Sequence, residues 1–270
     1  MELIKLAGIG FVLGITTIIP GVSTGTMAII FNVYDRLIGI ISPNIKKLAA
    51  AWKFWLPLVI GAIAGVAFLS KLVTLLYENH EIPVRWFFVG IIAGGIPSIY
   101  RKTKRQGSAL PSLPAVICCI LALAVMIAIA VLNPSKETAL YTELTPRLFG
   151  LLAVGGAAAA IAMIIPGISG SFLLLVIGLY RTVVQAVSEL NIPLLVPIAI
   201  GIFIGLFLGA AFVRFLLAKV PAETYGAVLG LVAGSVIVLY PGGWGSGVTI
   251  IISVICMLAG GSISYFSSQN

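Results

Sequence analysis

The sequence predicts an all-α polytopic membrane protein made of two inverted-topology repeats, each with a re-entrant helix hairpin and about three transmembrane helices. Of the 270 residues, 60% are hydrophobic and only 9% are charged, and the mean hydropathy is +1.19. Apolar stretches of about 17 to 25 residues, the length that spans a bilayer, recur along the chain. A Pro-Gly turn in an apolar setting occurs at Pro20-Gly21 and returns at Pro166-Gly167. Helices interrupted at matching positions of two halves are typical of transporters that bind substrate at the interruptions.

The N-terminal repeat is predicted over residues 1–133. Its first apolar segment has about 14 residues before Pro20, roughly 21 Å of helix, which is too short for a hydrocarbon core of about 30 Å. The segments on both sides of Pro20-Gly21 therefore predict a hairpin over about 6–41 that enters the membrane and returns. The next three apolar segments predict membrane-spanning helices over 54–77, 84–100 and 112–132.

The C-terminal repeat is predicted over residues 148–270, after an external linker at 134–147. Its hairpin, over about 148–187, is assigned from its match to the first one. Spanning helices are predicted over 194–218, 222–240 and 247–266. Three crossings per half are an odd number, so the second repeat is expected upside down relative to the first.

Charged residues between the apolar segments divide unequally between the two sides. One side collects nine cations: Lys5, Lys46, Lys47, Lys53, Arg101, Lys102, Lys104, Arg105 and Lys219. The other collects three: Arg85, Lys136 and Arg147. Because basic loops stay in the cytoplasm, both termini are predicted to be cytoplasmic, with the first hairpin opening from the cytoplasm and the second from outside. Basic loops facing anionic lipid also explain the net charge of +8, so no nucleic-acid partner is predicted.

Glycines repeat at four-residue spacing in both halves. Gly61 and Gly65 recur as Gly201 and Gly205, and Gly90 and Gly94 recur as Gly230 and Gly234. Small residues at this spacing allow helices in a membrane to approach closely. We therefore predict that these glycines serve helix packing.

Hydroxyl residues follow each break. The predicted phosphate-binding set on the first tip is Ser23, Thr24, Gly25 and Thr26, and on the second it is Ser169, Gly170 and Ser171. A helix that starts after a break has free N–H groups and a positive dipole end, which suit an anion such as phosphate or carboxylate. The same hydroxyls could cap their own helices, and capping is compatible with ligand binding.

Cations in or near apolar segments are functional candidates because holding one at membrane depth is costly. Lys71 and Arg214 are predicted phosphate contacts, and the alternative is that they snorkel to the interface. Secondary candidates are Arg36, Arg181, Tyr34 and Tyr180. For Arg36, an ion pair with the neighbouring Asp35 is a further alternative.

Catalysis is not expected. Asp35 is the only carboxylate near an apolar segment, and the single histidine, His80, falls in a predicted outer loop. The three cysteines, Cys118, Cys119 and Cys256, lie inside apolar segments without metal-ligand spacing. We therefore predict no enzyme activity, no metal and no cofactor.

The two hairpin motifs resemble those of the PopT polyprenyl-phosphate transporter family, formerly domain of unknown function 368. They read Pro20-Gly21-Val22-Ser23-Thr24-Gly25-Thr26 with Tyr34-Asp35-Arg36-Leu37, and Pro166-Gly167-Ile168-Ser169-Gly170-Ser171-Phe172 with Gly178-Leu179-Tyr180. The resemblance covers nearly the whole chain. It departs from the family pattern at Thr17, where an acidic residue is common, and at Thr24, where glycine is usual.

This resemblance implies a carrier that returns undecaprenyl phosphate from the outer to the inner leaflet of the bacterial cytoplasmic membrane, for peptidoglycan and other envelope synthesis. The implied partners are a polyprenyl phosphate lipid and membrane lipids, and a homodimer stays open. Three alternatives remain: a carrier for a small anionic solute, an intramembrane lipid phosphatase or transferase, and a non-transporting assembly subunit.

Overall fold

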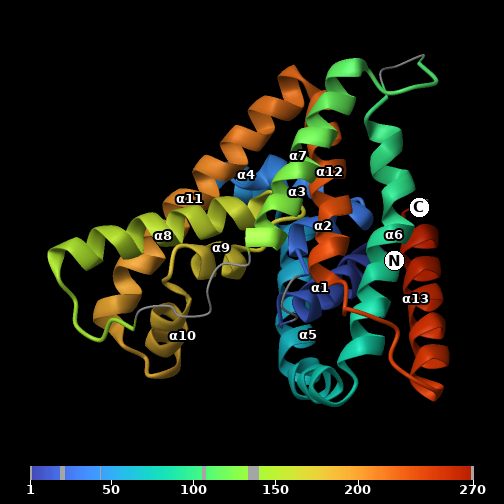
Figure 1. The fold of residues 1–270 in the computed structure, drawn as a ribbon. Helices are drawn as coiled ribbons and strands as arrows, with labels where there is room; N and C mark the ends of the chain where they lie inside the picture. The colour runs from blue at the N-terminus through green and yellow to red at the C-terminus, as the bar shows by residue number, and fades with distance from the viewer. Residues whose placement is uncertain (1, 19–21, 43, 105–107, 133–139, 269–270) are drawn as a thin grey trace.

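The structure is a computed structural model that describes residues 2–18, 22–42, 44–104, 108–132 and 140–268. Within these ranges the chain forms thirteen α-helices and no β-strand (Figure 1). The helices are α1 (Glu2–Ile18), α2 (Thr24–Ile30), α3 (Tyr34–Ile40), α4 (Ile45–Ala50), α5 (Trp52–Asn79), α6 (Glu81–Lys102), α7 (Leu113–Leu132), α8 (Pro146–Ile164), α9 (Gly170–Val176), α10 (Tyr180–Ser188), α11 (Ile192–Lys219), α12 (Pro221–Leu239) and α13 (Val248–Ser267).

Six helices in the described ranges are long and apolar enough to cross a membrane: α6, α7, α8, α11, α12 and α13. Five of them match the predicted spanning segments. The sixth, α8, was predicted as a hairpin arm, but it has 19 residues and a defined start, where Thr145 Oγ1 accepts from Leu148 N at 3.2 Å. The predicted span at 54–77 lies in α5, a helix of 28 residues that includes the apolar stretch Trp52–Phe68.

Helices α1 and α8 each pack against a later helix of their own half through glycine. A Cβ at Gly10 of α1 would lie 2.1 Å from Leu58 O of α5, and Gly14 faces Ala62 in the same way. In the second half, a Cβ at Gly156 of α8 would lie 2.6 Å from Ile198 O of α11. The two helix pairs therefore use equivalent, parallel, small-residue interfaces, as predicted for Gly61, Gly65, Gly201 and Gly205.

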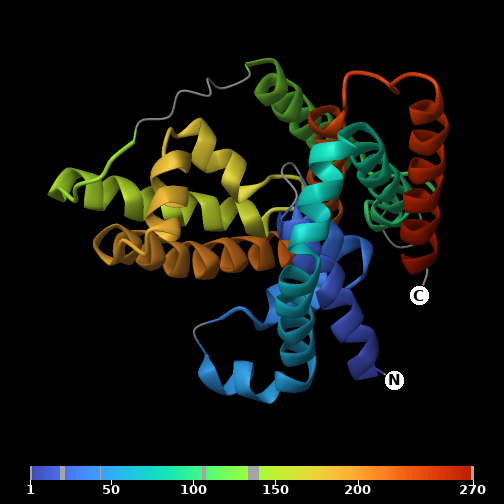
Figure 2. The same ribbon diagram turned by 90° about the horizontal axis from the view of Figure 1, so that it is seen from below.

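The remaining long helices, α6, α7, α12 and α13, pair across the two halves of the chain. A Cβ at Gly90 of α6 would lie 2.1 Å from Met257 O of α13, and one at Gly230 of α12 would lie 2.1 Å from Cys119 O of α7. Figures 1 and 2 both show α13 beside α6 at one edge of the molecule. The two halves are therefore interleaved, and each contributes one helix to each of these pairs.

The equivalent helices α6 and α12 run in opposite directions. At one end Lys102 Nζ lies 3.3 Å from Tyr225 Oη, and at the other end the rings of Trp86 and Tyr240 meet edge to face at 5.8 Å. The end of α6 thus meets the start of α12, and the start of α6 meets the end of α12.

The second half of each predicted hairpin consists of two short helices, α2 and α3 in the first half of the chain and α9 and α10 in the second. The breaks fall at Asn32, with φ +57°, and at Gly178, with φ +81°. These are equivalent positions, and asparagine and glycine are the residues that adopt the left-handed region most readily.

Buried side chains form a main core and a smaller one. The main core joins α1, α2, α3, α5, α6 and α12, with Ile164 and Val213 entering from α8 and α11. The smaller core lies between α8, α10 and α11 and includes Leu152, Leu179 and Ile198. Figures 1 and 2 show the reason: α8 and α11 extend side by side away from the other helices.

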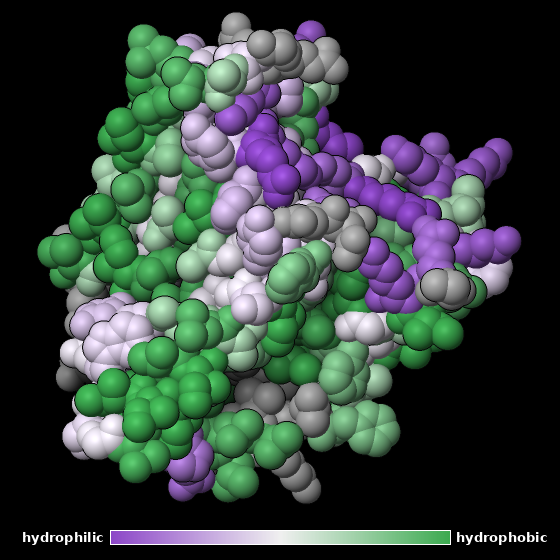
Figure 3. All heavy atoms as spheres, turned by 90° about the vertical axis from the view of Figure 1, so that its right-hand side faces the viewer, coloured by the Kyte–Doolittle hydropathy of each residue, from purple (hydrophilic) through white to green (hydrophobic). Residues whose placement is uncertain are grey.

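Much of the outer surface is apolar, as expected for contact with lipid. On the face shown in Figure 3, hydrophilic residues gather in one band, and hydrophobic residues cover much of the rest. Phe203, Phe212 and Ile255 are more than half exposed on α11 and α13. A protein in water would bury such side chains, so these surfaces fit a bilayer.

Candidate functional site

The residues around the two predicted breaks, the first tip (22–26) and the second tip (166–171), meet inside the protein. The hydroxyls of Ser23 and Thr26 accept from the backbone N–H of Gly167, at 3.3 and 2.8 Å respectively. Ser23 also caps α2, accepting from Thr26 N at 3.4 Å. Both side chains are buried. Hydroxyls of the first tip thus satisfy a backbone donor of the second, which a buried chain break requires.

Glycine makes this close approach possible. A Cβ at Gly25 would lie 3.2 Å from Met163 O and 3.3 Å from Pro166 Cα. Gly167 has φ +90°, and a Cβ there would lie 2.6 Å from Leu231 Cβ. The predicted breaks at Pro166 and Gly167 are therefore part of a tightly packed junction, whereas Pro20 and Gly21 lie outside the described residues.

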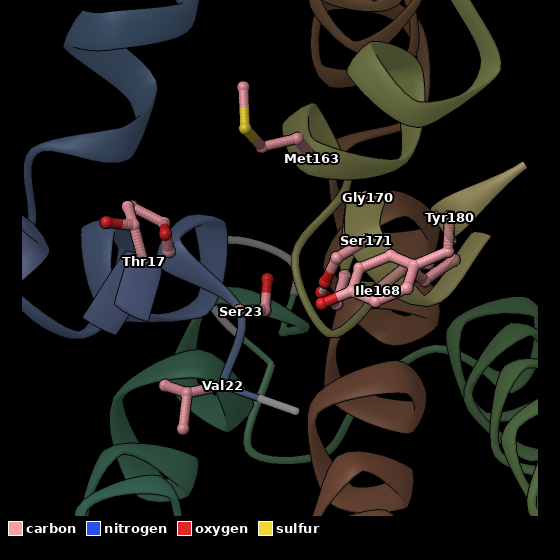
Figure 4. A pocket seen from close by; sticks show the side chains of 10 residues that line it. Thr17, Val22, Ser23, Met163, Ile168, Gly170, Ser171 and Tyr180 are labelled. Atoms are coloured by element: carbon pink, nitrogen blue, oxygen red, sulfur yellow. Dashed lines mark hydrogen bonds between the residues drawn. The ribbon is translucent and has the colours of Figure 1, made fainter. Parts of the chain in front are cut away.

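A cavity of about 270 Å³ opens beside this junction (Figure 4). Its lining residues are Thr17, Val22, Ser23, Thr24, Met163, Ile168, Ser169, Gly170, Ser171 and Tyr180. Residues of the first tip line one side, and those of the second tip and Tyr180 line the other. Six of the ten carry a hydroxyl group, so the cavity is a polar site between two otherwise apolar segments.

The serines of the second tip are available to a ligand. Ser169 stands at the start of α9, but its side chain makes no capping bond. Its hydroxyl instead lies 2.8 Å from the hydroxyl of Ser171. Among the residues that the structure describes, these two hydroxyls bond only to each other, so both can turn to donate to an anion.

Six predicted site residues line the cavity: Ser23, Thr24, Ser169, Gly170, Ser171 and Tyr180. Gly25 and Thr26 lie behind it, in the junction. Thr17 was not predicted as a ligand, yet it lines the cavity while its hydroxyl donates to Gly14 O at 2.7 Å. Its position three residues before Pro20 was the one feature of the sequence that could have placed Thr17 at the cavity.

The two matched tyrosines differ in their surroundings. Tyr34 is 3% exposed, and its hydroxyl donates to Ile164 O, the last residue of α8, at 2.9 Å. Tyr180 is 37% exposed and lines the cavity. One tyrosine therefore joins the two halves, while its counterpart faces the open space.

Arg214, Arg36 and Arg181 do not line the cavity in the part of the chain that the structure describes. Arg214 donates to the carbonyl oxygens of Ile38, at 2.7 Å, and Ile41, where α3 ends. Arg36 pairs with Glu2 at 3.2 Å and lies over the Phe54 ring, so the alternative of a pair with Asp35 was wrong.

Two other cations complete the predicted set. Arg181 is exposed on α10. The side chain of Lys71, on α5, lies outside the described residues.

Asp35 belongs to a separate polar cluster. Its carboxylate accepts from Lys102 Nζ at 2.9 Å and from the Tyr225 hydroxyl. This cluster ties α3 to α6 and α12, on the side of the protein where the basic loops lie. It does not line the hydroxyl cavity.

The cavity can bind and orient a polar group. None of its ten lining residues carries a charge at neutral pH. Within the described part of the chain, no cluster of three or more His, Cys, Asp or Glu could hold a metal ion. Hydroxyls arranged in this way suit hydrogen bonds to oxygen atoms of a ligand.

The chain matches the undecaprenyl phosphate translocase-like family over residues 13–255. It is 30% identical over 245 residues to a polyprenyl-phosphate transporter of Staphylococcus aureus, covering 86% of this chain and 84% of that protein. It is also 30% identical over 246 residues to a polyprenyl-phosphate transporter of Vibrio cholerae serotype O1, covering 86% and 76%. No solved structure matches it. Because the family match extends over most of the chain, this multi-pass membrane protein belongs to the undecaprenyl phosphate translocase-like family.

Proposed function

We propose that this protein transports polyprenyl phosphate, moving undecaprenyl phosphate from the outer to the inner leaflet of the bacterial cytoplasmic membrane with both termini in the cytoplasm. The observation that carries this proposal is the hydroxyl cavity where the two chain breaks meet. The names of the two relatives indicate the lipid class. A lipid phosphate needs a polar site for its head group only, because its chain stays in the bilayer.

The phosphate is held, in this proposal, by Ser23, Thr24, Ser169 and Ser171, with Tyr180 at the rim. Removing a charged group from water costs several kcal/mol, about the scale that a set of charge-assisted hydrogen bonds offsets. Helices α2 and α9 have only seven residues each, so their dipoles are small. The hydroxyls and the amides of the first turn therefore contribute most of the binding energy for the phosphate. None of the described lining residues carries a fixed positive charge, and this favours release of the phosphate.

Alternating access between two inverted repeats is the proposed mechanism. The opposite directions of α6 and α12 and the equivalent glycine interfaces of α1–α5 and α8–α11 support it. The same offset in sequence relates the Tyr34 and Ile164 O pair, which is bonded in this structure, to Tyr180 and Ile18 O, for which we propose an equivalent bond in another state of the protein. We propose that each contact forms when the cavity is closed on one side, so that the two contacts exclude each other.

The test is lipid flipping in vesicles that contain the purified protein. Replacing Ser169 and Ser171 together by alanine should slow flipping of polyprenyl phosphate at least about tenfold, because two charge-assisted bonds of about 1.5–3 kcal/mol each are lost. Ser188→Ala is the matched control, since Ser188 is exposed and bonds only Gln185 O. Unchanged flipping in the double variant would contradict the proposed site.

A carrier for a small anionic solute is the second candidate. The observation that favours it is the cavity itself, since about 270 Å³ lined by hydroxyls would also hold a free anion. Uptake of labelled inorganic phosphate, unaffected by added polyprenyl phosphate, would support this alternative. Flipping of polyprenyl phosphate that excess inorganic phosphate does not slow would support the lipid.

A further inference from the structure

A second cavity, of about 490 Å³, lies on another side of α1, between α1, α6 and α13. Its walls are mainly apolar and include Phe31, Phe87 and Phe88. Its volume is within the range of ligand pockets, roughly 300–1,000 Å³. An apolar groove of this kind accepts a hydrocarbon chain.

The groove follows one face of α1 from Lys5 through Gly8 and Val12 to Thr16. These positions are three or four residues apart and therefore share a helix face. The stretch from Lys5 to Thr16 is roughly 16 Å long at 1.5 Å per residue. The groove begins about one turn after the start of α1 and ends close to the predicted break at Pro20-Gly21.

Lys5 is the cation at the N-terminal end of this groove. Lys5 is exposed, and it forms no ion pair with any residue that the structure describes. Glu2, one turn earlier, pairs with Arg36. The groove thus combines an apolar channel with an available positive charge at one end, which is complementary to a lipid with an anionic head group.

The other end of the groove, at Thr16, is next in sequence to the lining of the hydroxyl cavity. Thr16 lines the groove, and its neighbour Thr17 lines the hydroxyl cavity. Helix α2 also runs between the two sites, because Thr24 at its start lines the cavity and Phe31 just after its end lines the groove. This continuity favours the transported lipid over an unrelated membrane lipid as the occupant.

We propose that the groove is a second binding site for the lipid phosphate, in which the phosphate pairs with Lys5 and the hydrocarbon chain lies along α1 toward Thr16. The proposal rests on the proposed function. The lipid reaches this site after its phosphate leaves the hydroxyl cavity, on the side of the membrane where the basic loops lie. Lys5 then supplies the charge that the hydroxyl cavity lacks.

The experiment uses the full chain in vesicles and a polyprenyl phosphate that carries a diazirine on the third isoprene unit from the phosphate, close enough to the head group to lie within the groove. After illumination, mass spectrometry identifies the labelled peptides. We expect label on α1 between Gly8 and Thr16 and on α6 near Phe87. Excess unlabelled polyprenyl phosphate should remove this label, whereas the same excess of phosphatidylglycerol should leave it.

Two variants test the groove directly. A Cβ at Gly8 meets no atom within 4 Å, so a side chain there starts in open space. Gly8→Trp should therefore occupy the groove and reduce labelling at least about tenfold. Gly150→Trp is the matched control, since a Cβ at Gly150 also meets open space. Lys5→Gln should weaken labelling about fivefold, the effect of one basic residue near an anionic group, and Lys5→Arg should retain it.

Labelling of Gly8→Trp equal to that of the wild type, or equal competition by phosphatidylglycerol, would overturn the groove assignment. Flipping and labelling are separate measurements. If the wild type flips polyprenyl phosphate but shows no label in the groove, only the groove assignment fails. If the wild type flips no polyprenyl phosphate, the proposed function fails.

Discussion

Thr26 and Gly167 join the two halves of the chain: the Thr26 hydroxyl accepts from the Gly167 N–H at 2.8 Å. Both residues follow a Pro-Gly break or form part of one. Thr26 is 1% exposed, so water does not replace this bond. The hydroxyls of the first tip therefore have two separate roles, since Thr26 holds the junction while Thr24 lines the cavity.

Thr26→Val should destabilise the protein because it leaves the buried Gly167 N–H with only the longer bond to Ser23. The expected loss is about 1–3 kcal/mol, the cost of an unsatisfied buried polar group. Thr24→Val makes the same chemical change two residues away, where the structure gives no hydroxyl bond to lose. The melting temperatures of the purified proteins in detergent should fall clearly for Thr26→Val and little for Thr24→Val. Equal falls would contradict the assigned roles.

Close helix contacts should make two glycines intolerant of alanine. A Cβ at Gly61 would lie 2.0 Å from Ala7 O, and one at Gly201 would lie 2.0 Å from Ala153 O. Each Gly→Ala change must separate two helices and should cost about 1–3 kcal/mol. Gly150→Ala is the control, because its Cβ has open space, and its melting temperature should stay unchanged or rise. If the Gly61 and Gly201 variants melt like this control, the helix interfaces are looser than described.

Arg214 is expected to act on α3 and not on the phosphate. Its guanidinium donates to the carbonyl oxygens of Ile38 and Ile41, which a helix end leaves without partners. Arg214→Gln should lower stability by about 1.5–3 kcal/mol, the value of a charged hydrogen bond. Binding of polyprenyl phosphate, measured on the folded protein below its melting temperature, should change less than about threefold. A large loss of binding with unchanged melting temperature would instead assign Arg214 to the phosphate.

The sequence predicted the paired breaks, most of the long helices and the cavity hydroxyls, because each depends on local pattern: hydrophobic length, Pro-Gly turns and residues that follow them. It did not predict that α6 pairs with α13 and α7 with α12. Glycine spacing shows that a helix has a close partner but does not identify it. The partners of Arg36 and Arg214 also escaped prediction, since each lies far away in sequence.

The role of Thr26 shows the same limit more sharply. Ser23, Thr24 and Thr26 look alike in the sequence, and only their angles around α2 separate them. Thr24 faces the cavity, Thr26 faces the second tip, and Ser23 contacts both. Helix periodicity distinguishes such positions only once the direction of the neighbouring tip is known.

The unequal positions of Tyr34 and Tyr180 lead to a test of alternating access. Tyr34→Phe removes the bond to Ile164 O and keeps the buried ring, so it should weaken the state in which this contact is formed. A neutral hydrogen bond contributes about 1 kcal/mol, which corresponds to roughly a fivefold change in population. Tyr180→Phe should shift the same equilibrium the other way, because its proposed bond to Ile18 O forms in the opposite state.

The measurement is thiol labelling of Ser171→Cys in vesicles, on a background in which Cys118, Cys119 and Cys256 are replaced by alanine. A membrane-impermeant maleimide is added to one side at a time. Tyr34→Phe should raise labelling from the side of the basic loops, and Tyr180→Phe should raise it from the other side. Tyr265→Phe, which changes an exposed ring on α13, should alter neither rate. Shifts in the same direction for both tyrosines would mean that the two contacts do not exclude each other, and alternation would then need a different pair of contacts.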